Sequence, residues 1–381
     1  MVRSAITIAD LRAAAKSRLP KILFDWVDGG AGDEATLRRN EEVFRSYCFA
    51  PRYLLDITGR KQTKSLFGQG FDAPFGIAPT GYNGLFRPGA DRMLANAARA
   101  ANIPMILSGS STEKIEDVVE IAPDNVWYQL YGSADAAITE DLIRRAADAG
   151  CRALVITIDI PLAARRERDL RNGFSIPLKV TPKLVLDGLM HPRWTARYFM
   201  SGGLPRMANW EPYAPAPLTA LQLAQFAETH SYCVQTWEHL ERFRALWPRR
   251  LLVKGVMNPA DARRAVGMGV DGLILSNHGG RQYDRSPAAI EVLPAIRQTV
   301  GNAVPVMVDG GIRRGSDILA CLAMGADFVF AGRAMLFGVV AAGQPGAERA
   351  ISILRDELDQ LMGQVGCTDL EDLPGDLVFR T

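Results

Sequence analysis

The stretch LILSNHGGRQYD, residues 273–284, joins a run of apolar residues to a polar loop. Its apolar start predicts a short buried strand, and the two glycines after His278 permit backbone conformations closed to other residues. A titratable imidazole and a fixed cation, Arg281, directly after a buried strand favour a binding or catalytic loop. The structural alternative is that His278 packs locally and Arg281 is solvated.

The same arrangement of apolar run, polar loop and helical stretch recurs along the chain. The apolar runs are PFGIAPT (74–80), PMILSGS (104–110), VWYQLYG (126–132), ALVITID (153–159), LLVKG (251–255), GLILSNH (272–278), PVMVDGG (305–311) and FVFAGR (328–333). The predicted helices between them are 90–101, 112–121, 135–149, 259–268, 287–300 and 316–324. Eight such strands predict an α/β fold, a closed parallel (β/α)8 TIM barrel. An open doubly wound sheet is the alternative, and the lack of an early GxGxxG turn weighs against it.

We expect one domain spanning residues 1–381. Within it, the sequence divides into an N-terminal helical segment (1–72), the barrel (73–345), an insertion between strands four and five (160–250), and a C-terminal helix and tail (346–381). In the last segment, 348–362 predicts an amphipathic helix that closes the barrel, and DLEDLPGDLVF (369–379) predicts a surface arm that serves oligomer contacts.

Composition narrows the functional classes. The 381 residues are 48% hydrophobic with a formal net charge of +2, so the chain can bury a large core and gives no sign of binding nucleic acid. The five cysteines lack CxxC spacing, which predicts reduced thiols and no metal site. No apolar run suits a signal peptide or a membrane span, so we expect a cytoplasmic protein.

Polar side chains stand at every predicted strand end. In barrels of this kind the active site lies at the carboxyl ends of the strands, so these side chains should converge on one rim. A single one of them could be a structural contact, but the whole set predicts a bound polar ligand. They are Thr80, Ser108, Gln129, Tyr131, Thr157, Asp159, Lys254, Ser276, His278, Asp309 and Arg333.

The last two units suggest what the ligand contains. DGGIRRG (309–315) and AGR (331–333) place glycines, main-chain N–H groups and arginines where such barrels commonly bind a phosphate. Lys254 adds a positive charge nearer the barrel axis. Both features suit flavin mononucleotide (FMN), and they also suit a sugar phosphate.

The motifs SNHGGRQYD, LVKG, DGGIRRGSD and AGRA resemble those of the FMN-dependent α-hydroxy acid oxidase and dehydrogenase family, from about Ile8 to near the C-terminus. APTGYNG, RRERDLRNGF and VLDGLMHPRW resemble the bacterial members that oxidise (S)-mandelate, although L-lactate dehydrogenases share several of these stretches. The resemblance implies oxidation of mandelate or a related aryl (S)-2-hydroxy acid. The alternatives are L-lactate dehydrogenase or an oxygen-using oxidase and, in other classes, a non-redox phosphate-binding barrel or an FMN-barrel isomerase.

The resemblance also assigns catalytic roles. His278 would accept the proton of the substrate hydroxyl, and Asp159 would pair with it, raise its pKa and fix its tautomer. Arg281 and Arg166 would bind the substrate carboxylate, Arg281 in a bidentate manner. Tyr131 would donate a hydrogen bond to the substrate oxygens.

For the cofactor, the resemblance places Lys254 beside N1 and the C2 oxygen of the flavin, where it stabilises negative charge on the reduced ring. A second set would contact the ring or the ribityl chain: Ala78, Pro79, Thr80, Ser108, Gln129, Thr157 and Ser276. A third set would bind the ribityl and phosphate end: Asp309, Gly311, Arg313, Gly332 and Arg333.

Two positions of the substrate pocket bear on specificity. Trp26 stands where family members usually have a tyrosine that contacts the substrate carboxylate. The substitution is either neutral or signals a different substrate, such as a larger aromatic acid, an ester or an amide, because indole has one N–H donor and no hydroxyl. Gly81 stands where oxidases tend to have alanine, which favours transfer of electrons to a quinone or another carrier instead of oxygen.

The insertion mixes basic and large apolar residues over 176–210, which favours peripheral attachment to the inner face of the cell membrane through 177–215. The members that oxidise mandelate use the matching segment at the membrane. A lid over the active site, or a contact with a second subunit, is the alternative. The family commonly forms tetramers, so we expect a homo-oligomer.

Overall fold

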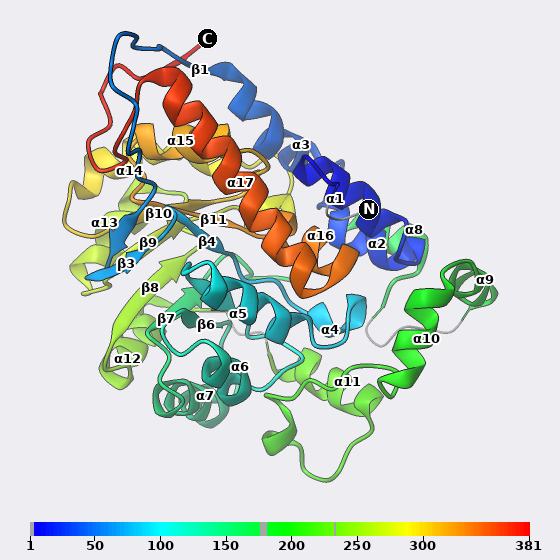
Figure 1. The fold of residues 1–381 in the computed structure, drawn as a ribbon. Coiled ribbons are helices and arrows are strands. Elements are labelled where there is room, and N and C mark those ends of the chain that lie inside the picture. The colour runs from blue at the N-terminus through cyan, green and yellow to red at the C-terminus, as the bar shows by residue number, and fades with distance from the viewer. Residues whose placement is uncertain (1–3, 176–180, 232–233) are drawn as a thin grey trace.

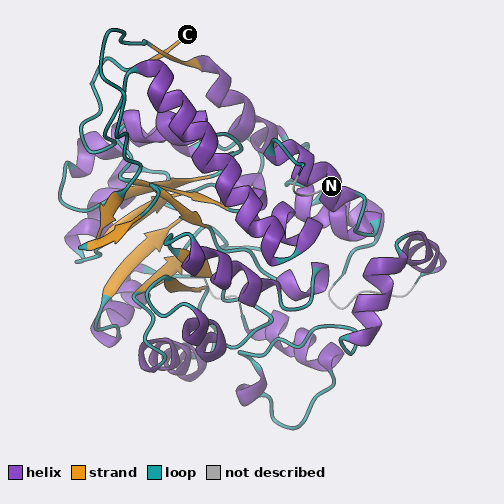
Figure 2. Cartoon of the chain, in the orientation of Figure 1, coloured by secondary structure: helices purple, strands orange, loops and turns teal. Residues whose placement is uncertain are grey.

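A computed structural model of the chain describes residues 4–175, 181–231 and 234–381. At its centre lies a closed barrel of eight strands surrounded by helices (Figures 1 and 2). The strands are β4 (Phe75–Ile77), β5 (Met105–Leu107), β6 (Val126–Leu130), β7 (Ala153–Thr157), β8 (Arg250–Lys254), β9 (Gly272–Leu275), β10 (Val306–Asp309) and β11 (Phe328–Ala331). These correspond to the eight predicted apolar runs.

All barrel strands are parallel, and each pairs with the next along the chain. The barrel closes where β11 pairs with β4, with Phe330 opposite Gly76. A side chain at Gly76 would meet the main-chain oxygen of Pro104 at 2.5 Å, so glycine allows the neighbouring strand to approach. The TIM-barrel prediction is therefore confirmed, and the open-sheet alternative is wrong.

The barrel interior is a packed apolar core. Trp127 and Phe330 lie edge to face with ring centroids 5.6 Å apart, and Phe328 contacts both Phe330 and Phe71. Phe71 belongs to a hairpin of β2 (Lys64–Leu66) and β3 (Gln69–Phe71). Because Leu66 and Phe71 belong to the same buried cluster as these interior side chains, ligands must bind at the opposite, carboxyl end of the strands.

Helices cover the outside of the barrel through one apolar face each. In α5 the fully buried Leu94, Ala95 and Ala98 recur at helical spacing, while Arg92 on the other side is exposed to solvent and pairs with Glu113. The outer helices are α4 (Asn83–Phe86), α5 (Ala90–Ala100), α6 (Ile115–Ile121), α7 (Ala136–Asp148), α12 (Trp237–Leu246), α13 (Pro259–Gly267), α14 (Ala289–Val300), α15 (Gly315–Ala323), α16 (Arg333–Ala342) and α17 (Gln344–Val365).

The N-terminal segment forms α1 (Ile8–Lys16), α2 (Lys21–Asp28), α3 (Ala35–Glu42) and the short 3-10 helix η1 (Val43–Ser46). Thr7 begins α1 with a capping box, since its side chain accepts from the N–H of Asp10 while the Asp10 carboxylate accepts from Thr7. Pro20 separates α1 from α2, because proline starts a helix more readily than it continues one.

The C-terminal tail lies on the surface, with most of residues 369–380 exposed or half-buried, and it is attached to the body of the molecule at its end. The strand β12 (Val378–Arg380) pairs antiparallel with β1 (Tyr47–Phe49). Leu370 and Leu377 are buried, because the amphipathic pattern of the tail faces the N-terminal segment. The helix before it, α17, extends beyond the predicted 348–362 at both ends and packs on α16 and α15.

Between β7 and β8 the described residues form α8 (Glu167–Asn172), α9 (Pro182–Met190), α10 (Pro192–Met200), the 3-10 turn η2 (Glu211–Tyr213), α11 (Ala220–His230) and α12. Helices α9 and α10 project away from the barrel (Figure 1). Trp194 attaches α10 to the body, because its indole N–H donates to the main-chain oxygen of Leu85 at 3.1 Å.

Candidate active site

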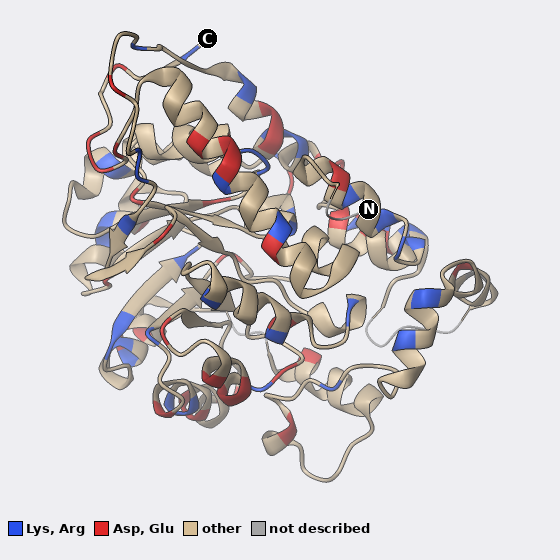
Figure 3. Ribbon diagram, in the orientation of Figure 1, with Lys and Arg blue, Asp and Glu red and all other residues tan. Residues whose placement is uncertain are grey.

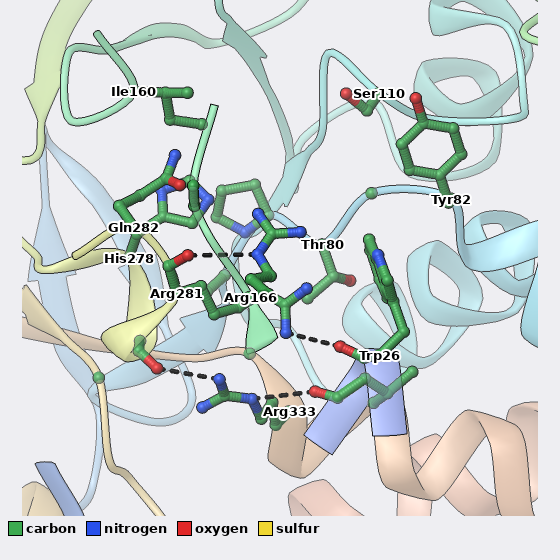
Figure 4. Close-up of a pocket in the computed structure, with 18 of the residues that line it drawn as sticks. Trp26, Thr80, Tyr82, Ser110, Ile160, Arg166, His278, Arg281, Gln282 and Arg333 are labelled. Atoms are coloured by element: carbon green, nitrogen blue, oxygen red, sulfur yellow. Dashed lines mark hydrogen bonds between the residues drawn. The ribbon is translucent and has the colours of Figure 1, made fainter. Parts of the chain in front are cut away.

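A cavity of about 580 Å³ opens at the carboxyl ends of the barrel strands (Figure 4). The insertion contributes to its wall through residues 160–164, through α8 and through Glu228 of α11. Fifteen of the predicted site residues line it: Trp26, Ala78, Pro79, Thr80, Gly81, Tyr131, Arg166, Lys254, His278, Arg281, Asp309, Gly311, Arg313, Gly332 and Arg333. The convergence of polar side chains on one rim is therefore present in the structure.

Five predicted residues are next to the strand ends but are not among the side chains that line the cavity: Ser108, Gln129, Thr157, Asp159 and Ser276. The Ser276 hydroxyl accepts hydrogen bonds from Lys254 Nζ at 2.8 Å and from the N–H of His278 at 3.0 Å. Ser276 therefore supports two cavity residues.

A buried chain of charges connects His278 to the barrel axis. His278 Nδ1 lies 2.8 Å from Asp159 Oδ1, and Lys254 Nζ lies 3.8 Å from Asp159 Oδ2 and 3.3 Å from Asp309 Oδ2. Because Nδ1 of the imidazole is bound to the carboxylate, Nε2 is the nitrogen left for a ligand. The predicted pairing of His278 with Asp159 is present.

Burial and charge act in opposite directions on these groups. Burial lowers the pKa of His278, and Asp159 raises it less than burial lowers it, so the pKa lies below its usual value. Burial favours the neutral form of Asp159, but His278 and Lys254 outweigh it and lower the pKa of that carboxyl. Asp309 and Asp159 outweigh the effect of burial on Lys254 and raise its pKa. His278 thus lies beside a charged group formed by Asp159, Lys254 and Asp309.

The backbone around His278 is held by the N-terminal segment. The amides of Asn277 and Asn40 donate to each other at 2.7 and 2.9 Å, which joins the loop to α3. Asp284 accepts from the N–H groups of Ala35 and Thr36 at the start of α3. At Gly280 the φ angle is 73°, and a side chain there would meet the main-chain nitrogen of Leu37 at 2.6 Å. The N-terminal segment therefore positions the loop that carries His278.

Two arginines converge on the cavity next to His278. Arg281 Nη1 donates to the main-chain oxygens of Trp26 at 2.6 Å and Gly29 at 2.9 Å, at the carboxyl end of α2. Arg281 Nη2 is buried and has no hydrogen-bond partner among residues 4–175, 181–231 and 234–381. Arg166 Nε donates to the main-chain oxygen of Arg281 at 3.2 Å. An anionic ligand is the natural partner for the Nη2 group.

A second cationic group lies at the cavity end formed by β10, β11 and the start of α16. Burial and the neighbouring Arg313 lower the pKa of Arg333 to about 10, which indicates uncompensated positive charge. The helix α16 begins here without a side-chain cap, because Gly332 precedes it. Arginines at an uncapped helix start are a suitable site for a phosphate. In the structure Arg333 donates to three main-chain oxygens and Arg313 pairs with Glu41.

Several cavity residues were not predicted from the sequence. Aromatic and aliphatic side chains from separate segments form much of the wall: Tyr82, Ile160, Leu162, Leu170 and Phe174. Asp169 and Phe174 lie in RRERDLRNGF, a stretch used only for the resemblance. The same stretch contains Arg166, which was predicted to line the site, so its neighbours Asp169 and Phe174 could have been predicted with it. Glu228 could not be predicted from its neighbours in the sequence, because only the folding of the insertion brings α11 to the cavity.

A TIM barrel with a histidine–aspartate pair, two arginines beside it and a phosphate-type site at its end is typical of enzymes that bind a phosphate-bearing cofactor or substrate. The chain belongs to the FMN-dependent dehydrogenase family, whose pattern matches residues 15–380. It is an oxidoreductase that uses FMN to oxidise 2-hydroxy acids. The family resemblance seen in the motifs is confirmed.

Named relatives narrow the comparison. The chain is 38% identical over 377 residues to the (S)-mandelate dehydrogenase of Pseudomonas putida, covering 99% of this chain and 94% of that protein. It is 40% identical over 373 residues to a putative L-lactate dehydrogenase of Mycobacterium tuberculosis, covering 97% and 88%. A crystal structure of the monotopic membrane protein (S)-mandelate dehydrogenase superposes with a TM-score of 0.94 at 37% identity, covering 99% of this chain and 100% of that one.

The residues present fit FMN. Gln129 Nε2 and Thr157 Oγ1 are buried without hydrogen-bond partners among the described residues, and polar atoms of a flavin ring are suitable partners for them. Gln129 Oε1 already accepts from Ser108 and the N–H of Gly109, which leaves its amide group free to donate. The arginines suited to the FMN phosphate, Arg333 and Arg313, lie at the cavity end formed by β10, β11 and the start of α16.

Proposed function

We propose that this enzyme oxidises an aryl (S)-2-hydroxy acid, such as mandelate, to the 2-oxo acid. One observation carries the proposal: the His278–Asp159 pair, with imidazole and carboxylate 2.8 Å apart, lies in the same cavity as the unpartnered Nη2 of Arg281. A base and a carboxylate-binding cation in one cavity match the two functional groups of a 2-hydroxy acid. They distinguish the enzyme from a non-redox phosphate-binding barrel or an isomerase.

The catalytic roles follow from this geometry. Arg281 and Arg166 bind the carboxylate and so fix the orientation of the substrate, with Tyr131 donating to its oxygens. His278 accepts the hydroxyl proton at Nε2, and Asp159 stabilises the imidazolium that forms. Bound FMN supplies the two-electron oxidation. Lys254 holds Asp159 and Asp309 in place and provides positive charge at the barrel axis.

The FMN-binding residues are proposed as two groups. The ring and ribityl chain are held by Ala78, Pro79, Thr80, Ser108, Gln129, Thr157, Lys254 and Ser276. The ribityl and phosphate end is held by Asp309, Gly311, Arg313, Gly332 and Arg333. The unpartnered amide of Gln129 and the uncapped start of α16 support this assignment.

The preference for an aryl side chain rests on the cavity wall. Trp26 and Phe174 lie with ring centroids 5.6 Å apart, and Tyr82 meets Trp26 edge to face at 6.1 Å. An aromatic ring gains both apolar burial and ring contacts from such a wall. A methyl group, as in lactate, would leave much of it uncovered, which makes lactate the second candidate.

An anaerobic absorbance spectrum of the purified flavoprotein tests the substrate. We expect (S)-mandelate to bleach the flavin band at concentrations at which L-lactate has little effect, with (R)-mandelate as the stereochemical control. Faster bleaching by L-lactate would favour the lactate assignment. A flavin band that no 2-hydroxy acid bleaches would contradict the proposed function.

The proposed electron acceptor is a quinone or another carrier, because Gly81 takes the place of the alanine usual in oxidases. Rates of reoxidation of the reduced enzyme by a soluble quinone and by air distinguish the two. We expect the quinone to act much faster. Comparable rates in air would support the oxidase alternative.

Peripheral membrane attachment through 177–215 is part of the proposal. Six large apolar side chains of α9 and α10 are between 51% and 86% exposed: Val185, Leu186, Leu189, Met190, Phe199 and Met200. Basic bands lie on α10 beside them (Figure 3), from Arg193 and Arg197. Leu184, Trp194 and Tyr198 pack partly against the core instead, Arg206 pairs with Glu211, and Lys179 lies outside the described residues. None of the described helices is long and apolar enough to cross a bilayer.

This attachment would place the enzyme on the inner face of the cell membrane, close to a lipid-soluble acceptor. The crystal structure with a TM-score of 0.94 is named as a monotopic membrane protein, which supports the same location. A homo-oligomer, expected to be a tetramer, completes the proposal, and light scattering of the detergent-free protein measures its mass.

A further inference from the structure

Trp26 lies at the carboxyl end of α2, with its indole in the wall of the cavity (Figure 4). Aromatic rings surround it on the protein side: Phe86 at 5.3 Å and Phe174 at 5.6 Å between ring centroids, and Tyr82 edge to face. These contacts fix the plane of the indole. The side chain is therefore a rigid surface and not a mobile gate.

The indole also lies beside two arginines that line the cavity, Arg281 and Arg166. The guanidinium carbon of Arg281 lies 4.6 Å from the centroid of the Trp26 ring, and that of Arg166 lies at 5.9 Å. The main-chain oxygen of Trp26 also accepts from Arg281 Nη1 at 2.6 Å. One residue thus holds the Arg281 guanidinium both by a hydrogen bond and by its ring face.

Arg281 requires such support because its surroundings are unfavourable to a cation. It is half-buried, and this burial together with Arg166 and Arg333 holds its pKa well below the usual value. Asp169, in the cavity wall, raises the pKa of Arg281 by its negative charge, but less than burial lowers it. No ion pair to Arg281 is present among the described residues, so its guanidinium is supported by the main-chain oxygens of Trp26 and Gly29 and by the indole face.

We infer that Trp26 is a positioning residue that aligns the guanidinium of Arg281, so that the buried Nη2 is presented to the carboxylate of the substrate. In this arrangement the indole replaces a hydrogen bond from a tyrosine hydroxyl with a cation–π contact on the arginine itself. The inference rests on the proposed function, since it takes a 2-hydroxy acid as the ligand. It predicts that Trp26 affects anionic ligands selectively.

The binding of two inert ligands can show whether Trp26 positions Arg281 or only forms an apolar part of the cavity wall. Phenylacetate carries the carboxylate but no hydroxyl to oxidise, and phenylacetamide is its neutral counterpart. Their dissociation constants are measured from the change in the flavin spectrum of the holoenzyme. We expect Trp26→Leu to weaken phenylacetate binding about tenfold, the order of magnitude of one desolvated cation–π contact, and to change phenylacetamide binding by less than about twofold.

Two further variants show whether the effect depends on the ring face of Trp26 itself. Trp26→Phe keeps a weaker ring face and should lose an intermediate part of the phenylacetate affinity, and it serves as the test if the leucine variant does not fold. Phe174→Leu removes a neighbouring ring that makes no cation–π contact with either arginine among the described residues, so it should weaken both ligands equally. Thermal unfolding of each holoenzyme checks its folding.

Each outcome bears on one proposal. Selective loss of phenylacetate binding in Trp26→Leu, partly recovered in Trp26→Phe, supports the positioning role. Parallel loss of both ligands, or no loss, overturns it and leaves Trp26 as an apolar wall. If the wild-type holoenzyme binds neither phenylacetate nor mandelate, the proposed function itself fails, independently of any variant.

Discussion

Asp159 Oδ1 lies 2.8 Å from Nδ1 of His278, although the two residues are 119 positions apart in the chain. Asp159 follows β7 and His278 follows β9, two strands that are separated in the barrel by β8. Lys254, the last residue of β8, lies between them and contacts Asp159. The pair is therefore built by the order of the strands.

Replacement of Asp159 by asparagine should change the pH dependence of catalysis. A neutral His278 is the active base, so kcat/KM should rise with pH through the pKa of His278, at a midpoint below 6.5 because burial lowers that pKa. Asp159 raises the pKa, so Asp159→Asn should move the midpoint to still lower pH. It should also lower the maximal rate by roughly 10- to 100-fold, because the imidazolium loses its partner.

The insertion offers a matched control for this variant. His191 and Asp187 form a second histidine–aspartate pair, 3.3 Å apart and outside the cavity. Asp187→Asn should leave the pH profile unchanged. A midpoint that moves to higher pH in Asp159→Asn would contradict the assigned role.

Gly81 should tolerate alanine poorly, because the added Cβ would lie 2.9 Å from Cβ of Ser110. Gly81→Ala should lower the free energy of unfolding by about 1–3 kcal/mol, the usual cost of overpacking. Addition of Ser110→Gly should restore most of this loss. Urea denaturation of the two single variants and the double variant measures the coupling, and strict additivity would show that the structure relieves the contact without a change at Ser110.

The rate of reoxidation in air, measured on the same proteins, shows whether residue 81 affects the use of oxygen as the electron acceptor.

Asp91 is a buried carboxylate that joins two loops of the active site. It accepts from Asn83 Nδ2 and from Ser111 Oγ, each at 2.6 Å, and Asn83 also donates to Thr80 at 3.0 Å. Burial raises the pKa of Asp91 to about 6. The native state therefore binds a proton more tightly than the unfolded chain does, and this group contributes stability at low pH that is lost as the pH rises from about 4 to about 6.

Asp91→Asn removes this titration. The difference in free energy of unfolding, Asp91→Asn minus wild type, should be about 2 kcal/mol larger at pH 7 than at pH 4.5, so the variant is relatively more stable at pH 7. Urea denaturation at the two pH values gives the difference, in which other titrating groups cancel. An equal effect of the substitution at both pH values would mean that Asp91 stays ionised throughout.

Membrane attachment can be tested with charges on α9 and α10. The triple variant Leu189→Glu, Phe199→Glu and Met200→Glu should lose most of its co-sedimentation with anionic vesicles, because each change removes an exposed apolar contact and adds repulsion. Activity with a soluble acceptor should persist. A short loop in place of 177–215 should give the same result.

The control carries the same added charge elsewhere. Tyr53→Glu, Leu54→Glu and Leu55→Glu alter another exposed apolar stretch, in the N-terminal segment. This variant should still co-sediment with the vesicles. Equal loss in both variants would indicate non-specific repulsion, and unchanged binding of the α9 and α10 variant would rule out this surface.

The barrel and most of the cavity-lining residues could be predicted from local sequence patterns. Apolar runs alternating with amphipathic helices are local patterns, and they place Lys254, Asp309 and His278 at strand ends that a parallel barrel must bring together. The pairing of His278 with Asp159 could be predicted only through the family resemblance, because strand spacing alone does not assign partners.

Tertiary structure decided the contacts between distant segments. The indole of Trp26 on the Arg281 guanidinium, the paired amides of Asn40 and Asn277, and the attachment of the tail through β1 and β12 join residues with no local relationship in the chain. Burial, which lowers the pKa of His278 despite Asp159, also exists only in the folded molecule. These features depend on packing between elements, whereas strands and helices follow from the order of apolar and polar residues.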